Sequence, residues 1–108
     1  MKVSDYIITY LAEKGVDTIF MVPGGQAMFL NDAVYRTKQI KPIFTHHEQA
    51  AGMAAEAYGR ISGNLGVAMV TAGPGAINAL TGVAGGWTDS APMMVLSGQS
   101  SLSNTVYM

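Results

Sequence analysis

The chain has no cysteine, little charge and no long apolar run. The absence of cysteine among 108 residues excludes disulfide bonds and thiolate metal sites, and it is compatible with a reducing cytoplasm. Charged residues make up only 12% of the chain, and a net charge of −1 without a basic block gives no sign of nucleic-acid binding. No apolar run reaches the roughly 18 residues of a membrane span, and no signal-peptide pattern occurs near the N-terminus. We therefore expect a cytoplasmic protein that does not enter a membrane.

Apolar residues are abundant, at 49% of the chain. A chain of this length forms at most one domain, and a small isolated domain normally carries more charge because most of its residues touch water. The surplus of apolar residues suggests that further chain or another subunit covers part of the surface.

Helices and strands are expected to alternate. We predict a first helix capped by Ser4 and ended by Gly15, a third helix closed near Gly63, and a polar, irregular tail from Gly98. The predicted later helices cover residues 27–35, 48–61 and 76–88, and the predicted strands cover 18–22, 43–45, 67–71 and 93–96. Apolar strands that alternate with helices predict an α/β fold, a three-layer parallel sheet with helices on both faces.

Glycine and uncommitted polar residues follow every predicted strand. Because the carboxyl ends of parallel strands meet at one edge of a sheet, these residues should lie together, at the edge where such folds bind ligands. The four segments are Pro23-Gly24-Gly25-Gln26, His46-His47-Glu48-Gln49, Ala72-Gly73-Pro74-Gly75 and Ser97-Gly98-Gln99-Ser100.

Glu48 is the main candidate for chemistry, and it has two interpretations. As a first-turn acid it would simply suit the helix dipole, which is worth about 0.3–1 kcal/mol. Alternatively, small neighbours would give its carboxyl dry surroundings, in which a carboxylic acid can keep a proton near neutrality and donate it. The small neighbours are Ala50, Ala51, Gly52 and Ala54.

The other unusual residues also have structural interpretations. Gly73-Pro74-Gly75 could cradle a phosphate, but it lacks the Lys and Ser/Thr of a P-loop, and taken by itself it is better explained as a tight strand-to-helix turn. His46 and His47 are adjacent and should point in different directions, so a shared metal is not expected and at least one should be a structural hydrogen-bonding group. Asp89-Ser90 is most simply a helix end and turn, and Trp87 a core or interface residue rather than a stacking platform.

Five motifs resemble the pyrimidine-binding domain of thiamine-diphosphate enzymes, and their order resembles acetolactate synthase and its relatives. The likeness runs over essentially the whole chain. The motifs are Val22-Pro23-Gly24-Gly25, His47-Glu48-Gln49-Ala50-Ala51, Ala57-Tyr58-Gly59-Arg60, Thr71-Ala72-Gly73-Pro74-Gly75-Ala76-Ile77-Asn78, and Asp89-Ser90-Ala91-Pro92 followed by Ser97-Gly98-Gln99.

The resemblance implies a role for Glu48 as the glutamate that hydrogen-bonds the cofactor's pyrimidine N1′ and so activates thiamine diphosphate. It also implies a 2-oxo-acid substrate, a carboligase or decarboxylase reaction of the lyase or transferase type, and a homodimer or tetramer with the site between subunits. The residues that match the loops around the pyrimidine are Pro23, Gly24, Gly25, Gly73, Pro74, Gly75 and Asn78.

Two departures from acetolactate synthases concern specificity. His46 stands where those enzymes usually carry Arg, and Ser100-Ser101-Leu102-Ser103-Asn104 replaces the usual Val and Phe-Gln segment. Another carboligase or decarboxylase is therefore equally credible, and FAD as a further cofactor is left open. The resemblance places the diphosphate and Mg²⁺ in a separate domain, so we expect the chain to be inactive alone. It also implies further strands after the fourth, so we expect residues 1–108 to be a truncated pyrimidine-binding domain that breaks off at Met108.

Two alternatives stay open. The chain could be a separate pyrimidine-binding subunit that works only with a partner chain, as in sulfopyruvate-type decarboxylases. It could also be a non-catalytic α/β module that binds nucleotides, for which Glu48→Gln would leave ligand binding intact.

Overall fold

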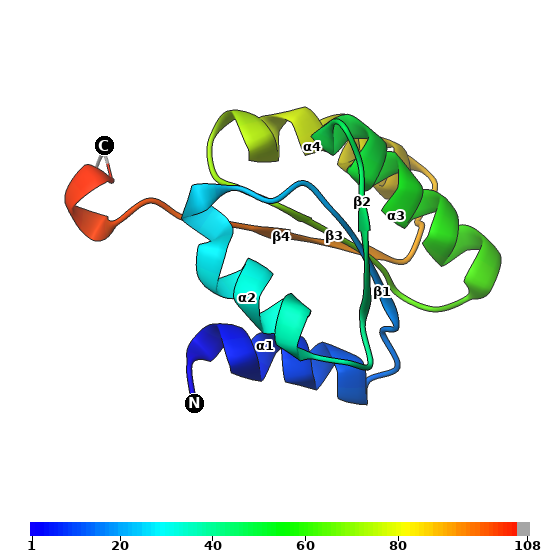
Figure 1. Cartoon of the computed structure of the whole chain (residues 1–108). Coiled ribbons are helices and arrows are strands. Elements are labelled where there is room, and N and C mark those ends of the chain that lie inside the picture. The colour runs from blue at the N-terminus through cyan, green and yellow to red at the C-terminus, as the bar shows by residue number, and fades with distance from the viewer. Residues whose placement is uncertain (106–108) are drawn as a thin grey trace.

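The computed structural model describes residues 1–105, in which helices and strands alternate along the chain (Figure 1). The expectation of a break at Met108 lies outside these residues. The helices are α1 (Val3–Glu13), α2 (Met28–Arg36), α3 (Glu48–Ser62) and α4 (Pro74–Thr88), with short 3₁₀ turns η1 (Gly25–Ala27) and η2 (Leu102–Asn104). The strands are β1 (Thr18–Met21), β2 (Lys41–Phe44), β3 (Gly66–Val70) and β4 (Met93–Ser97).

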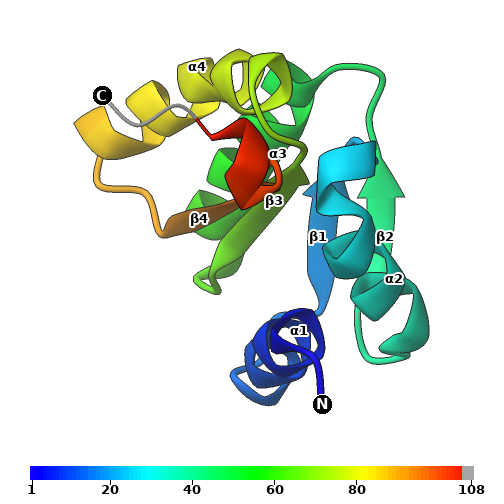
Figure 2. The ribbon, with the colours of Figure 1, turned by 90° about the vertical axis from the view of Figure 1, so that its left-hand side faces the viewer.

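The strands form one parallel sheet in the order β2-β1-β3-β4. Helices α1 and α2 lie on one face of this sheet, and α3 and α4 lie on the other (Figures 1 and 2). Strand β3 is central and all its residues are buried, as expected of a parallel strand that is covered on both faces. The predicted α/β class and its three layers are confirmed.

Large aliphatic side chains fill the face under α1 and α2. Ile8 and Leu11 of α1 and Val34 of α2 pack against alternate residues of β1 and β3, which point to the same face because side chains alternate along a strand. The buried members of this cluster, which we call the aliphatic face, are Ile8, Leu11, Val16, Ile19, Met21, Ala33, Val34, Ile40, Val67 and Met69.

Small residues fill the opposite face, under α3 and α4. Its buried cluster consists of Ala51, Ala55 and Ala68, against which Phe20, Met93 and Val95 pack. Helices α3 and α4 touch each other through glycine, because a Cβ placed on Gly82 would lie 2.4 Å from the carbonyl carbon of Gly52. We call this side of the sheet the small-residue face.

The structure corrects several sequence-based boundaries. Ser4 is not a helix cap, because α1 already begins at Val3, and the Ser4 hydroxyl is buried without a hydrogen-bond partner.

Strand β2 begins at Lys41 and includes Pro42, which an edge strand tolerates because not all of its N–H groups are needed for pairing. Helix α4 begins at Pro74 rather than residue 76, since proline suits the first helical turn. The tail after Gly98 contains the short turn η2.

The surface of the described part of the chain carries several large apolar side chains. Ile61 and Trp87 are 89% and 86% exposed, so Trp87 is not a core residue of this chain. Ile77 and Leu80 of α4 are also more than half exposed. Within residues 1–105, none of the helices combines the length and the apolar character that crossing a membrane would require.

Candidate functional site

The carboxyl edge of the sheet contains a topological switch point. From β1 the chain continues to β2 toward one edge strand of the sheet, whereas from β3 it continues to β4 toward the other edge strand. The connections that leave the adjacent strands β1 and β3 therefore run in opposite directions. Ligands of open α/β sheets bind at such a point, outside the carboxyl ends of the strands. The glycine-containing segments identified in the sequence flank this position.

The side chain of Thr71, the residue that follows β3, contacts both glycine turns, Pro23-Gly24-Gly25 and Gly73-Pro74-Gly75. A Cβ on Gly24 would lie 2.4 Å from the Thr71 Cβ, and a Cβ on Gly75 would lie 2.8 Å from the Thr71 Cγ2. At Gly24 and Gly75 only glycine, which has no Cβ, allows the backbone to come this close to the threonine side chain. Gly73, in the second of these turns, has a positive φ of 63°, which also favours glycine. Sequence reasoning did not single out Thr71, because its role depends on contacts between distant loops.

Glu48 lies beside the second of these turns. As the first residue of α3 it is half-buried, and its Oε1 is 3.8 Å from the position that a Cβ on Gly75 would occupy. Its other oxygen, Oε2, accepts a hydrogen bond from the Asn78 Nδ2 at 3.2 Å. The structure therefore brings together three of the predicted site residues, Glu48, Gly75 and Asn78.

The surroundings of the Glu48 carboxyl are only partly those expected. Ala51 and Gly52 are buried, but they face the sheet and α4, Ala54 is half-buried, and Ala50 is exposed. The two residues that the structure shows close to the carboxyl, Gly75 and Asn78, both belong to α4. The Glu48 carboxyl thus lies beside the backbone of Gly75 and accepts a hydrogen bond from Asn78.

His47 holds the start of α3 in place. Its Nδ1 accepts a hydrogen bond from the Gln49 N–H at 3.1 Å, and so the imidazole acts as the helix cap directly before Glu48. His46 is exposed. The expectation that one of the two histidines has a structural hydrogen-bonding role is confirmed. Among residues 1–105, no three His, Asp or Glu side chains are grouped closely enough to hold a metal ion.

The loops after β1 and β4 are also joined. The Gln99 N–H donates to the Gln26 carbonyl at 3.2 Å, and the Gln26 Nε2 donates to the Ser100 Oγ at 2.7 Å. Gln26 was noted in the sequence only as part of a turn, and its pairing with Ser100 could not be read from residues 74 positions apart. Ser100 belongs to the segment in which the chain departs from acetolactate synthases.

The predicted residues Pro23, Gly25, Gly73 and Pro74 are exposed at the same edge of the sheet. A Cβ on Gly25 or Gly73 would meet no atom within 4 Å, so open space adjoins both turns. Pro23 instead lines a hollow of about 170 Å³ on the α2 side, together with Asn31 and Phe44. The part of Pro23 in cofactor binding stays a prediction.

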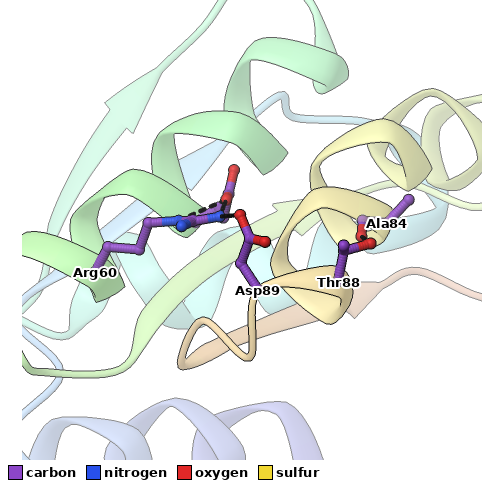
Figure 3. Close-up of polar contacts among 5 residues, drawn as sticks. Arg60, Ala84, Thr88 and Asp89 are labelled. Carbon is purple, nitrogen blue, oxygen red and sulfur yellow. Dashed lines mark hydrogen bonds and ion pairs between the residues drawn. The ribbon is translucent and has the colours of Figure 1, made fainter.

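An ion cluster joins α3 and α4 at the end remote from Glu48. The Arg60 guanidinium pairs with Glu56 on its own helix and with Asp89, which ends α4 (Figure 3). Hydrogen bonds to Asp89 and then to Glu56 raise the pKa of Arg60 above its ordinary value. Ser90 follows in a left-handed turn with φ of 55°, which confirms the expected helix end and turn at Asp89-Ser90. The two helices are thus tied at both ends and touch through glycine between them.

Comparison with known proteins identifies relatives for almost the whole chain. The family described as "Thiamine pyrophosphate enzyme, N-terminal TPP binding domain" matches residues 1–106. The acetolactate synthase large subunit of Lactococcus lactis subsp. lactis is 45% identical over 96 residues, which are 89% of this chain and 17% of that protein. The large subunit of Haemophilus influenzae is 41% identical over the same shares of each chain. The chloroplastic acetolactate synthase of Arabidopsis thaliana is 39% identical over 98 residues, 91% of this chain and 15% of that protein.

The region of similarity includes the carboxyl edge of the sheet, with Glu48, Thr71 and both glycine turns. The chain spans about a sixth of the length of these curated relatives. The match over residues 1–106 nevertheless includes every described helix and strand. The chain therefore belongs to the family of N-terminal TPP-binding domains of thiamine pyrophosphate enzymes.

Proposed function

We propose that this chain is the part of a thiamine-diphosphate-dependent enzyme in which Glu48 binds and activates the cofactor's aminopyrimidine ring. The substrate is a 2-oxo acid, and the reaction is a carboligation or a decarboxylation, as the acetolactate synthase relatives suggest. The observation that carries the proposal is the half-buried carboxyl of Glu48 beside Gly75 at the switch point of the sheet.

The residues at this edge fit a flat heteroaromatic ring. Within residues 1–105 the Glu48 Oε1 receives no hydrogen bond, so it is available to a ligand, whereas Oε2 is bonded to Asn78. Gly25 and Gly73 adjoin open space, and a ring could approach their backbone closely because no side chain stands there. Glu48 would hold the pyrimidine, and the glycine turns would form the wall beside it.

Thiamine diphosphate, when bound, supplies the electron sink that 2-oxo-acid decarboxylation requires. The contribution of this chain would be the Glu48 carboxyl, as the group that exchanges a proton with a ring nitrogen. The family resemblance places the diphosphate and its Mg²⁺ on another domain. A site that lies between subunits agrees with the large apolar side chains exposed on α4, such as Ile77 and Trp87.

The test replaces the acid with its amide in the complete enzyme. Glu48→Gln should lower the rate of thiamine-diphosphate-dependent CO₂ release from a panel of 2-oxo acids by roughly 10²–10⁴-fold, the usual contribution of a positioned proton donor or acceptor. Cofactor binding is measured in parallel by calorimetry. Glu13→Gln, the same change at an exposed residue at the end of α1, should leave the rate unchanged.

The result also separates the alternatives. A Glu48→Gln enzyme with undiminished CO₂ release would refute the proposed role. If the unmodified protein and the Glu48→Gln variant both bind the ligand, and neither releases CO₂ from any 2-oxo acid, a non-catalytic binding module would be favoured. Activity that requires a second polypeptide would favour the two-chain arrangement.

A further inference from the structure

The hydrogen bond between Asn78 and Glu48 joins two helices at the candidate site. Asn78 lies one turn into α4, and Glu48 is the first residue of α3, 30 positions earlier in the chain. Both residues are half-buried. The sequence resemblance assigns Asn78 to the cofactor, but in the structure its amide contacts the carboxyl that is expected to act on the cofactor.

The packing of the two helices fixes this contact. A Cβ on Gly82 would lie 2.4 Å from the Gly52 carbonyl carbon, so the helix backbones touch near the middle of α4. At the far end, Arg60 of α3 pairs with Asp89 at the end of α4 (Figure 3). Because α4 cannot slide or rotate along α3 without breaking these contacts, the backbone positions from which Asn78 and Glu48 reach each other are held.

A hydrogen bond to one carboxyl oxygen biases where the proton of that carboxyl resides. The carbonyl oxygen of a carboxylic acid is a stronger acceptor than its hydroxyl oxygen, so an amide N–H favours the oxygen that carries no hydrogen. The Asn78 N–H occupies Oε2. When Glu48 is protonated, the hydrogen bond therefore favours the proton on Oε1, which is the oxygen near Gly75 and the open edge of the sheet.

We propose that Asn78 is a positioning residue, which directs the Glu48 proton to Oε1 and so presents it to the ring nitrogen of the cofactor. This inference rests on the proposed function. Asn78 acts through the carboxyl and does not need to touch the cofactor. Its removal should weaken the presentation of the proton, whereas an acceptor in its place should draw the proton to the wrong oxygen.

Two variants of similar size separate these effects in the complete enzyme. Asn78→Leu removes the donor, and kcat should fall roughly tenfold with KM unchanged, as expected for one hydrogen bond used only in catalysis. Asn78→Asp offers an acceptor in place of the donor, and it should lower kcat further than Asn78→Leu. A purely structural role predicts the reverse order, because aspartate resembles asparagine more closely in shape and polarity.

A second readout uses the apoenzyme and does not depend on turnover. Isotope-edited infrared spectra, each taken as a difference from the same protein carrying Glu48→Gln, isolate the Glu48 carboxyl band at a pH that protonates it. The carbonyl band should move to higher frequency in Asn78→Leu because the carbonyl oxygen loses its hydrogen-bond donor. Asn64→Asp, the same chemical change at the exposed turn after α3, should alter neither the band nor kcat.

The outcomes distinguish this inference from the proposed function. If Glu48→Gln is inactive but the carboxyl band is unmoved in Asn78→Leu, only the role of Asn78 is refuted. An Asn78→Asp enzyme that is no slower than Asn78→Leu would refute it as well. If Asn78→Leu fails to fold, the closer mimic Asn78→Asp is compared with the unmodified enzyme, and an undiminished kcat would refute the role of Asn78. Full activity of Glu48→Gln would refute the proposed function itself.

Discussion

The two faces of the sheet are built on opposite principles. The aliphatic face, under α1 and α2, is filled by long side chains such as Ile8, Ile19 and Met69. The small-residue face, under α3 and α4, is filled mainly by alanine, and its helices approach each other through glycine. Both helices whose first turns carry the candidate site, α3 and α4, lie on the small-residue face (Figure 1).

The difference shows how the chain separates stability from positioning. Burial of large aliphatic side chains supplies most of the hydrophobic free energy, which grows with the apolar area removed from water. Alanine and glycine bury less area, but they allow backbones to touch, so that side chains at the helix ends are held at short, fixed distances. The Glu48–Asn78 hydrogen bond is one such contact.

The largest effect should come from shortening a side chain on the aliphatic face. Ile8 is fully buried, so Ile8→Ala should lower the free energy of unfolding by about 2–5 kcal/mol through lost burial and a residual cavity. Urea denaturation followed by circular dichroism measures the change. Ile61→Ala makes the same substitution at a residue that is 89% exposed, and its effect should stay within about 0.5 kcal/mol. Equal losses in the two variants would contradict the assignment of Ile8 to the core of the aliphatic face.

The small-residue face should respond to enlargement. Gly82→Ala places a Cβ 2.4 Å from the Gly52 carbonyl carbon, so the helices must separate, and we expect a loss of about 1–3 kcal/mol in the free energy of unfolding. The matched control lies on the same helix. A Cβ on Gly85 would come no closer than 3.5 Å to Glu56, so Gly85→Ala should stabilise the protein by up to about 1 kcal/mol through helix propensity. Stabilisation by both substitutions would show that close helix contact is not required.

The smallest effect concerns the amino edge of the sheet, where Tyr58 of α3 donates a hydrogen bond to Asp17. This bond is the largest cause that raises the pKa of Tyr58 above its ordinary value and lowers the pKa of Asp17 below its ordinary value. The Tyr58 contribution to stability is present below its ordinary pKa and is lost as the pH rises through its folded value. The Asp17 contribution is present above its ordinary pKa and is lost as the pH falls through its folded value.

Tyr58→Phe should therefore lower the melting temperature slightly near neutral pH, and the difference from the unmodified protein should shrink at both extremes of pH. The ring, which packs edge-on against Phe20, is retained in the variant. Melting curves recorded over a range of pH provide the measurement. A difference that does not vary with pH would mean that the hydroxyl group contributes nothing through Asp17.

Local patterns in the sequence predicted the elements of the fold. The apolar run at residues 67–71 is typical of a central parallel strand, and β3 is buried throughout. Gly63 was correctly predicted to close α3, because its left-handed conformation, with φ of 73°, favours glycine. Ser4 was wrongly predicted as a cap, since serine has the same local signature whether it precedes a helix or lies inside its first turn.

The candidate site was predictable only as a list of residues. Its place at the carboxyl edge follows from strand direction, and the motif resemblance identified Glu48. The contacts of Thr71 with Gly24 and Gly75 depend on how three loops pack, and the bond from Asn78 to Glu48 depends on the crossing of two helices. Such distances arise from tertiary packing, which no local pattern in the sequence contains.

The central position of β3 has a consequence for the motions of the molecule. Its backbone is hydrogen-bonded to β1 on one side and to β4 on the other, so its amide hydrogens should be among the last in the chain to exchange with deuterated water. Thr71 is attached directly to this slowly exchanging strand. The threonine against which both glycine turns rest should thus keep its place during the frequent small openings that begin at the outer strands.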